Sequence, residues 1–238
     1  MMIQFFLNNL QRALLHVFFP LECLHCDEEM ACESSPLCTV CAGLLDYLDP
    51  AVRCPFCFEE LHSFPCLSCK TKERPLFEKA ACFDYMGPIA TLLKKMKYEN
   101  QPYLAKSLAP FLALQWARLQ WETPDWILPI PLTWHHQFKR GYYQGALLAQ
   151  ELSVFLHVPI LSCLQRSGVG HSQAKFSKAL RLQLSPLAFH VKEPTKLFGA
   201  SLLIIDDVMT TGSTLQAVAE ALSPYSPKNI RALVLCKG

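Results

Sequence analysis

The chain has 238 residues, twelve of them cysteine, and a formal net charge of +2. This length fits one large domain or a core domain with a small appendage, and the low net charge excludes a bulk polycation, although Lys and Arg cluster locally at 94–97, 139–140 and 175–181. No segment approaches the ~20 uninterrupted apolar residues that a membrane-spanning helix requires.

Residues 1–20 are rich in Phe and Leu, but they predict an amphipathic helix rather than a signal peptide. Polar residues interrupt the apolar run, no basic segment precedes it, and Ile3, Leu7, Leu10 and Leu14 recur at helical spacing. We expect the apolar face to pack on the rest of the chain, with attachment to a membrane surface or a partner as the alternative. The expected location is cytoplasmic.

Residues 21–74 contain four C-x-x-C pairs. Two such turns supply the four sulfurs of a tetrahedral zinc site, so four pairs predict two zinc ions. The simplest grouping places the first two pairs on one ion and the last two on the other, although the spacing also allows crossed pairing. A segment this poor in apolar periodicity needs metal ligation to fold. The predicted zinc ligands are Cys23, Cys26, Cys38, Cys41, Cys54, Cys57, Cys66 and Cys69.

Two other uses of these cysteines are less consistent with the sequence. Structural disulfides require an oxidising compartment, and the sequence does not predict a signal peptide that would lead there. Redox-active C-x-x-C pairs usually occur singly, whereas this segment has four in a row. We expect the zinc ions to be structural, because four thiolates leave no coordination position for water. The remaining cysteines are interpreted as ordinary small apolar residues: Cys32, Cys82, Cys163 and Cys236.

From residue 78 to 238 the pattern changes to alternating strands and helices. This alternation predicts a parallel sheet covered by helices on both faces, with a ligand site beyond the carboxyl ends of the strands. Pro110 is expected to bend or split the second helix. Strands are expected at 79–85, 125–130, 201–206 and 229–238, and helices at 87–98, 101–122, 141–156, 175–184 and 213–223.

The stretch LLIIDDVMTTGSTL, residues 202–215, places two adjacent acids at the end of an apolar strand and a hydroxyl-rich turn before a helix. Backbone N–H groups at a helix start form a cradle for a phosphate. Asp206 and Asp207 would repel that phosphate, so they are better suited to hydroxyl groups beside it. The implied ligand is a ribose 5-phosphate. The alternative is an Asp helix cap followed by a polar turn without a ligand.

The segment IIDDVMTTGST resembles the phosphoribosyl pyrophosphate signature of type I phosphoribosyltransferases. The wider arrangement, from about Leu21 onward, resembles the ComF or GntX family of competence protein F-like proteins. Two further segments carry the likeness, LPIPLTWHHQFKRGYYQGALLAQEL and LQRSGVGHSQAKFSKALRLQL. The resemblance implies an α/β fold: a type I phosphoribosyltransferase-like parallel sheet flanked by helices, at residues 78–238, preceded by a small double zinc-ribbon domain.

The resemblance also implies roles for individual residues. The two acids would contact the ribose hydroxyls, the following loop the 5-phosphate, and Pro129–Leu132 the pyrophosphate, which magnesium and nearby cations must neutralise. Lys139 and Arg140 are the implied cations, with a solvated surface pair as the alternative. Lys97 resembles a basic position of the family that would approach the same cleft, with a helix C-terminal cation as the alternative. The implied catalytic residues are Asp206, Asp207 and Arg140, and the implied ligand-binding residues are Asp206, Asp207, Val208, Met209, Thr210, Thr211, Gly212, Ser213, Thr214, Pro131, Lys139, Arg140 and Lys97.

Two functions follow from these expectations. The first is a phosphoribosyltransferase that uses phosphoribosyl pyrophosphate and Mg²⁺, with an acceptor that the sequence does not reveal. The second, implied by the family, is a non-catalytic module for DNA uptake in natural transformation, which binds single-stranded DNA and competence proteins such as a DNA-translocating helicase and uses the pocket for ligand sensing. In that case Phe56, Phe58 and Phe64 would stack on bases.

Two further pairs of residues receive weaker expectations. Gln173 and Lys175 lie where type I enzymes carry a mobile loop over the substrate. The neighbouring His135 and His136 are interpreted as surface residues, because nothing else in the sequence supports a catalytic role for them.

Overall fold

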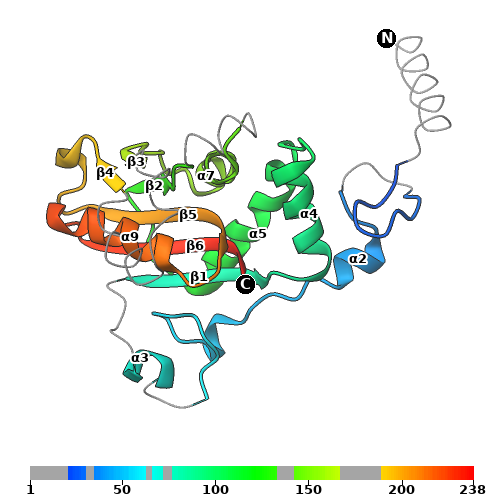
Figure 1. Ribbon diagram of the computed structural model, residues 1–238, viewed down its shortest axis with the longest axis horizontal. Helices are drawn as coiled ribbons and strands as arrows, with labels where there is room; N and C mark the ends of the chain where they lie inside the picture. Colours follow the sequence, from blue (N-terminus) through cyan, green and yellow to red (C-terminus); the bar gives the residue numbers. More distant parts are fainter. Residues whose placement is uncertain (1–20, 31–34, 63–65, 72–76, 133–141, 167–188) are drawn as a thin grey trace, which may run out of the picture.

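The computed structural model describes residues 21–30, 35–62, 66–71, 77–132, 142–166 and 189–238 (Figure 1). The helices expected at 1–20 and 175–184 lie outside these residues.

A four-stranded parallel sheet forms the centre of the molecule, with strand order β1-β6-β5-β2. Its strands are continuous apolar runs, which is typical of parallel strands that are buried on both faces. The sheet and its flanking helices confirm the fold class predicted from the sequence. The strands are β1 (Glu78–Asp84), β2 (Trp126–Pro129), β5 (Ser201–Met209) and β6 (Asn229–Lys237).

Four helices accompany the sheet, close to their expected positions. Pro110 lies inside α5, which is one helix and is not split. The proline is exposed, so the carbonyl that it leaves without a donor, that of the exposed Lys106, faces water. The helices are α4 (Gly87–Tyr98), α5 (Leu104–Leu119), α7 (Gln144–Leu156) and α9 (Ser213–Leu222).

A second, antiparallel sheet of two short strands was not expected from the sequence. It consists of β3 (Leu164–Arg166) and β4 (Phe189–Val191). Each strand has three residues, which is too short for an alternating pattern to stand out. Three short 3₁₀ helices also lie among the described residues: η1 (Pro50–Val52), η5 (Pro194–Lys196) and η6 (Ser223–Tyr225).

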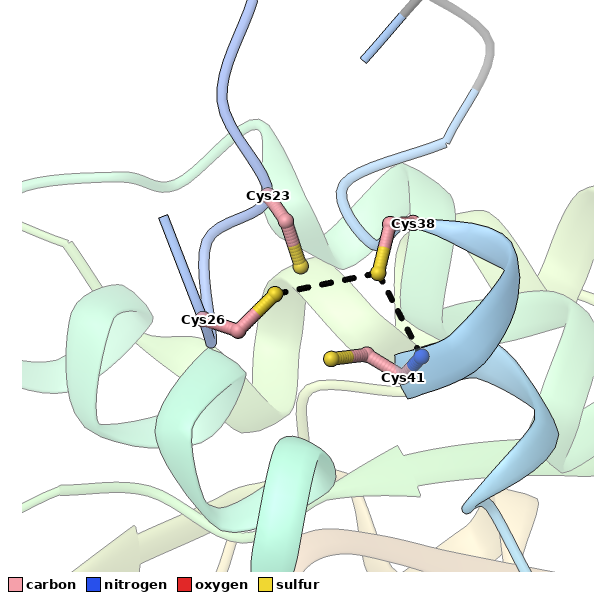
Figure 2. A group of neighbouring side chains, drawn as sticks. All are labelled: Cys23, Cys26, Cys38 and Cys41. Atoms are coloured by element: carbon pink, nitrogen blue, oxygen red, sulfur yellow. Dashed lines mark hydrogen bonds between the residues drawn. The ribbon is translucent and has the colours of Figure 1, made fainter. Parts of the chain in front are cut away.

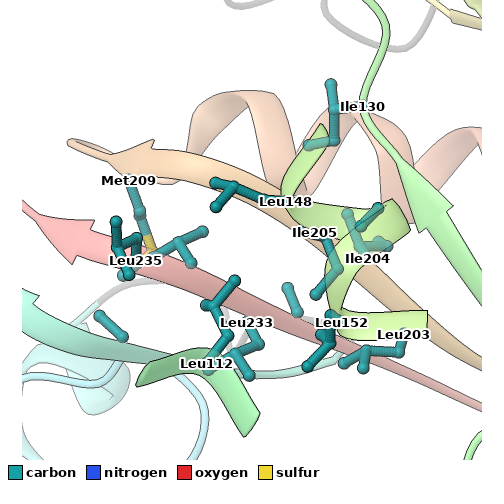
Figure 3. Packing of buried hydrophobic residues seen from close by; sticks show 14 of the residues in the cluster. Leu112, Ile130, Leu148, Leu152, Leu203, Ile204, Ile205, Met209, Leu233 and Leu235 are labelled. Carbon is teal, nitrogen blue, oxygen red and sulfur yellow. The ribbon is translucent and has the colours of Figure 1, made fainter. Parts of the chain in front are cut away.

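The hydrophobic core fills the space between the sheet and the helices (Figure 3). Leu203 and Ile205 of β5 and Leu233 of β6 are at most 1% exposed, as are Leu112 of α5 and Leu152 of α7. Full burial of each such side chain stabilises the fold by about 1.5–3 kcal/mol. Packing of this kind holds the carboxyl end of β5 in a fixed position.

The four cysteine pairs lie in two separate places (Figure 1). The first two pairs lie beside α4, and the last two lie beyond β1. His25 Nδ1 lies 2.8 Å from Thr91 Oγ1 on α4, and the N–H of Lys79 on β1 donates to the Pro55 carbonyl at 3.0 Å. Two short helices belong to these segments, α2 (Thr39–Gly43) and α3 (Leu67–Thr71).

The chain between the two cysteine segments is hydrogen-bonded to β1, at the edge of the sheet. The Leu48 N–H donates to the Cys82 carbonyl on β1 at 2.8 Å. The buried Gln115 amide on α5 donates to the carbonyls of Leu48 at 2.8 Å and Ala81 at 2.9 Å. These bonds fix the connection to the α/β core. Among the described helices, none has both the length and the apolar character needed to cross a bilayer.

Candidate functional site

Asp206 and Asp207 lie near the carboxyl end of β5. The strand was expected to end at Asp206, but it continues to Met209 because Val208 and Met209 pair with β6. The Asp207 N–H donates to Asp206 Oδ1 at 2.9 Å. Successive side chains of a strand point to opposite faces, so this bond turns the Asp206 carboxylate back toward the neighbouring backbone.

Lys97, in the last turn of α4, reaches this acid pair. Its Nζ lies 3.0 Å from Asp207 Oδ1, and the two side chains are only 14% and 13% exposed. The structure thus brings Lys97 against the acid pair, and its place in the last turn of α4 also fits a helix C-terminal cation. A pair with so little exposure is screened less by solvent than a surface ion pair.

Burial raises the pKa of the Asp206 carboxyl to about 7, and the Asp207 carboxylate acts in the same direction. The Asp207 N–H, Lys97 and Arg166 oppose this rise. Near neutral pH the Asp206 carboxyl is therefore poised between its protonated and ionised forms. An incoming group that donates hydrogen bonds favours the fully ionised form.

Two groups that the sequence did not assign to the site lie near Asp206. Arg166, at the end of β3, has its pKa lowered by burial, while Asp206 and Tyr143 oppose that change; its guanidinium lies 5.4 Å from the Phe189 ring centre. Tyr143, which precedes α7, has its pKa raised by burial and by both aspartates. Its buried hydroxyl has no hydrogen-bond partner among the described residues.

The sequence did carry a signal for these two residues. Tyr143 lies in LPIPLTWHHQFKRGYYQGALLAQEL, and Arg166 is the third residue of LQRSGVGHSQAKFSKALRLQL, the two further segments that resemble the family. Their proximity to the acids could not be read from the sequence, because it depends on how β3 and the start of α7 pack.

The loop after β5 turns at Gly212, whose φ of 76° is in the left-handed region, and α9 begins at Ser213. The Ser213 N–H donates to Thr211 Oγ1 at 3.3 Å, and that hydroxyl donates to Ser213 Oγ at 3.0 Å. Thr210, Thr211 and Ser213 are exposed. The loop thus presents hydroxyls at a helix start, where anions are favoured.

The other residues expected at the site fall into three groups. Val208 is half-buried, and Thr214 is the second residue of α9. Met209 is 4% exposed, so its side chain lies in the core, and its carbonyl accepts the Gly238 N–H at 2.9 Å. Pro131 follows β2, and the adjacent Ile130 N–H donates to Ile205 O at 3.3 Å. Outside the described residues lie Lys139, Arg140, His135, His136, Gln173 and Lys175.

The eight paired cysteines form two tetrads, here called the first (Cys23, Cys26, Cys38, Cys41) and the second (Cys54, Cys57, Cys66, Cys69). Within each tetrad the sulfurs lie within 4.8 Å of one another. The sulfurs of the first point toward a common centre (Figure 2), with Cys26 and Cys38 3.7 Å apart.

The sulfur spacing of the second tetrad is similar: Cys54 and Cys69 are 3.7 Å apart, and Cys57 and Cys66 are 3.6 Å apart. A tetrahedral site with Zn–S bonds of about 2.3 Å places its sulfurs about 3.8 Å apart. Both tetrads therefore fit a zinc ion, in the simplest of the groupings that the sequence allowed.

The role suggested for Phe58 is wrong. Its side chain is 1% exposed, and the Arg53 guanidinium lies 5.6 Å from its ring centre. The ring forms part of the core beneath the second tetrad and is not available to stack on a base. Phe64 lies outside the described residues, and Cys82, Cys163 and Cys236 are buried, as expected for small apolar residues.

The comparison with known families agrees with this fold. The profile described as phosphoribosyl transferase domain matches residues 114–238, more than half of the chain, and the chain therefore belongs to that family. The matched region contains β2, α7, β5, α9 and β6, together with the acid pair and the loop after it.

Curated relatives extend the likeness to the cysteine segments, and they identify the chain as a homologue of the competence protein F group, as predicted. It is 29% identical to competence protein F of Haemophilus influenzae, over 92% of this chain and 98% of that protein. It is 29% identical to DNA utilization protein YhgH of Escherichia coli O157:H7, over 90% and 96%. It is 24% identical to competence protein ComFC of Bacillus subtilis, over 84% and 88%.

Proposed function

We propose that the chain binds phosphoribosyl pyrophosphate with Mg²⁺ and transfers the phosphoribosyl group to an acceptor. The observation that carries this proposal is the position of the acid pair, directly before the loop that opens α9. A phosphate at the helix start and a diol at the carboxylates are the two ends of one pentose phosphate.

In this proposal Asp206 and Asp207 accept hydrogen bonds from the ribose hydroxyls, and residues 210–214 hold the 5-phosphate. Lys97 holds the Asp207 side chain in place through its 3.0 Å contact. The Tyr143 hydroxyl, which lacks a partner in the described part of the chain, is available to hydrogen-bond the substrate.

Departure of the pyrophosphate creates negative charge that must be neutralised. Mg²⁺ bound with the pyrophosphate would act as a Lewis acid and stabilise this charge. We assign the protein's contribution to this stabilisation to Lys139, Arg140 and the segment Pro129–Leu132. Displacement at the anomeric carbon passes through a cationic, oxocarbenium-like species, so positioning and charge stabilisation suffice and no covalent nucleophile is needed.

We further propose that both tetrads hold structural zinc, within a ribbon region at residues 21–74 that precedes the transferase region at 78–238. The sulfur spacing supports this assignment. Zinc ligation requires reduced thiols, which the cytosol maintains, and this supports a cytoplasmic location.

The proposal is tested by calorimetric titration of phosphoribosyl pyrophosphate in the presence of Mg²⁺. Wild-type protein should bind it, and the double variant Asp206→Asn with Asp207→Asn should lose binding and any Mg²⁺-dependent release of pyrophosphate. Asp84→Asn, at the carboxyl end of β1, is the matched control and should bind normally. Wild-type protein that does not bind at millimolar donor would reject the proposal.

A second candidate function is a module that handles single-stranded DNA, with the pocket used for ligand sensing. The names of the relatives, competence protein and DNA utilization protein, suggest it. A hollow of about 610 Å³ on another part of the molecule supports it, since more cations than anions line it. The charged residues that line it are Arg53, Lys79, Arg118 and Arg231, with Asp49 and Glu78.

The DNA function is tested by retention of a single-stranded oligonucleotide at increasing salt. Arg118→Ala with Arg231→Ala should weaken retention and flatten its salt dependence, because fewer phosphates are neutralised. Lys196→Ala with Lys228→Ala removes two exposed cations elsewhere and is the control. A wild-type chain that ignores single strands even at low salt would remove this candidate.

A further inference from the structure

Tyr142 connects the chain that leads into α7 to the end of α4. Its hydroxyl donates a hydrogen bond to the carbonyl of Met96, a residue 46 positions earlier in the sequence. The Tyr142 side chain packs against the hydrophobic core, and the Met96 side chain is fully buried within it. Both partners are therefore held by packing, and the bond between them has a fixed place in the fold.

The carbonyl that accepts this bond belongs to the last turn of α4. The last four carbonyls of an α-helix have no partner within the helix, and in α4 the carbonyl of Met96 is one of them. The chain leaves the helix shortly afterwards, since Asn100 has a φ of 54°, in the left-handed region. The Tyr142 hydroxyl thus satisfies a carbonyl at a helix end, where fraying is common.

The same turn carries Lys97, the cation that reaches the acid pair. The Met96 carbonyl and the Lys97 nitrogen belong to one planar peptide unit. A bond that fixes this carbonyl therefore also fixes the backbone from which the Lys97 side chain extends. That side chain ends 3.0 Å from Asp207 Oδ1, in a contact where both side chains are largely buried. A lysine loses much rotamer entropy when it is held, so a backbone that is already fixed makes the contact easier to keep.

We propose that Tyr142 is a positioning residue for the acid pair and acts through Lys97. Its hydroxyl fixes the peptide unit between Met96 and Lys97, and Lys97 in turn holds the Asp207 carboxylate in the orientation that accepts a ribose hydroxyl. Without the hydroxyl, the last turn of α4 frays and Lys97 leaves Asp207 for part of the time. This inference rests on the proposed role of the acid pair in binding the ribose.

The first test is Tyr142→Phe, which removes the hydroxyl and keeps the ring that packs on the core. The affinity for phosphoribosyl pyrophosphate with Mg²⁺ should fall about three- to tenfold, as expected for one lost hydrogen bond. Tyr103→Phe is the matched control, because the Tyr103 hydroxyl donates to Gln101 Oε1 at 3.1 Å in an exposed position at the start of α5. It should bind with wild-type affinity.

The second test repeats Tyr142→Phe in a Lys97→Met background. If the tyrosine acts through the lysine, the second substitution should change the affinity for the donor by less than about twofold there, because its effect has already been lost. A tyrosine that only stabilises the fold would weaken binding by the same factor in both backgrounds. The two backgrounds therefore separate positioning from stability.

The third test follows amide hydrogen exchange at residues 97–99 in the free protein, so it does not depend on any ligand. The Glu99 N–H donates to the Lys95 carbonyl at 2.9 Å and closes the last turn of α4. Exchange of this amide should quicken several-fold in Tyr142→Phe and stay unchanged in Tyr103→Phe, because only the first variant frees the end of the helix.

Unchanged affinity in Tyr142→Phe, or an equal loss in both Lys97 backgrounds, would overturn the inference. Failure of the wild-type protein to bind phosphoribosyl pyrophosphate would instead reject the proposed function. In that case the exchange of Glu99, together with the coupling between Tyr142→Phe and Lys97→Met in the free energy of unfolding, still decides whether the tyrosine holds the lysine in place.

Discussion

Asp206 makes the stability of the protein depend on pH. Its pKa is raised from 3.8 to about 7, so between these values the folded state keeps a proton that the unfolded state has released. Stability is therefore lost as pH rises from about 4 to 7, and it stays reduced above that.

Asp206→Asn should remove this penalty, since an amide does not ionise and its oxygen can still accept the Asp207 N–H. We expect the variant to be more stable than wild type at pH 8 and similar to it near pH 4, measured as the free energy of unfolding in urea. Asp46→Asn, at an exposed position, should show no such difference. A variant that is less stable than wild type at pH 8 would contradict the raised pKa.

The same carboxylate predicts that ligand binding depends on pH. Ribose hydroxyls donate to ionised carboxylates, so the affinity for phosphoribosyl pyrophosphate should rise as pH increases through about 7. Comparison with Asp206→Asn separates this effect from titration of the ligand itself. A wild-type profile that runs parallel to that of the variant would argue against a diol at this acid.

Lys97→Met should leave the Asp207 carboxylate unpaired in a site where it is only 13% exposed. The expected loss of stability is about 1–3 kcal/mol, and it should largely disappear in an Asp207→Asn background. Lys95→Met is the control on the same helix, because its pair with Glu99 is more exposed and should contribute within about 0.5 kcal/mol. Equal losses for the two lysines would contradict a special role for Lys97.

At the scale of elements, the sequence predicted the segments with strong periodicity. α4 coincides with the helix expected at 87–98, and β6 with the strand at 229–238 except for its last residue. The prediction fell short where packing decides: β5 extends past Asp206 through pairing with β6, and β3 and β4 are too short to carry a pattern. The contacts of Lys79 and Arg166 depend on elements distant in sequence.

The turn between β5 and α9 yields a prediction at this scale. Gly212→Ala should destabilise the protein by about the 1–2 kcal/mol that a left-handed non-glycine residue costs, because the new Cβ would meet only the end of the flexible Lys79 side chain, which can move aside. Gly199→Ala, at a φ of +67° with open space around it, should lower the free energy of unfolding by a similar amount. A much larger loss at Gly212 than at Gly199 would contradict this account of the turn.

At the scale of the whole molecule, the cysteine segments and the sheet share one hydrophobic core. Cys23, Leu37 and Phe58 belong to the same buried cluster as the strands, and Leu48 and Pro55 hydrogen-bond to β1. Metal loss should therefore affect the entire fold and not only the cysteine segments.

Metal analysis of purified protein should find about two zinc ions per chain, as two complete tetrads require. Cys26→Ser and Cys57→Ser should each reduce this to about one and lower the thermal midpoint of the whole chain in a single transition. Cys163 lies outside both tetrads, so the variant Cys163→Ser should retain both zinc ions. Well under one zinc per wild-type chain would contradict the metal assignment.

The most direct test of the central claim is a crystal structure of the wild-type chain with phosphoribosyl pyrophosphate and Mg²⁺. We predict that Asp206 and Asp207 contact the two ribose hydroxyls while the backbone N–H groups and hydroxyls of residues 210–214 surround the 5-phosphate. A structure at saturating ligand in which the acids remain bonded only to Lys97 and the neighbouring backbone, with nothing bound at the loop, would contradict it.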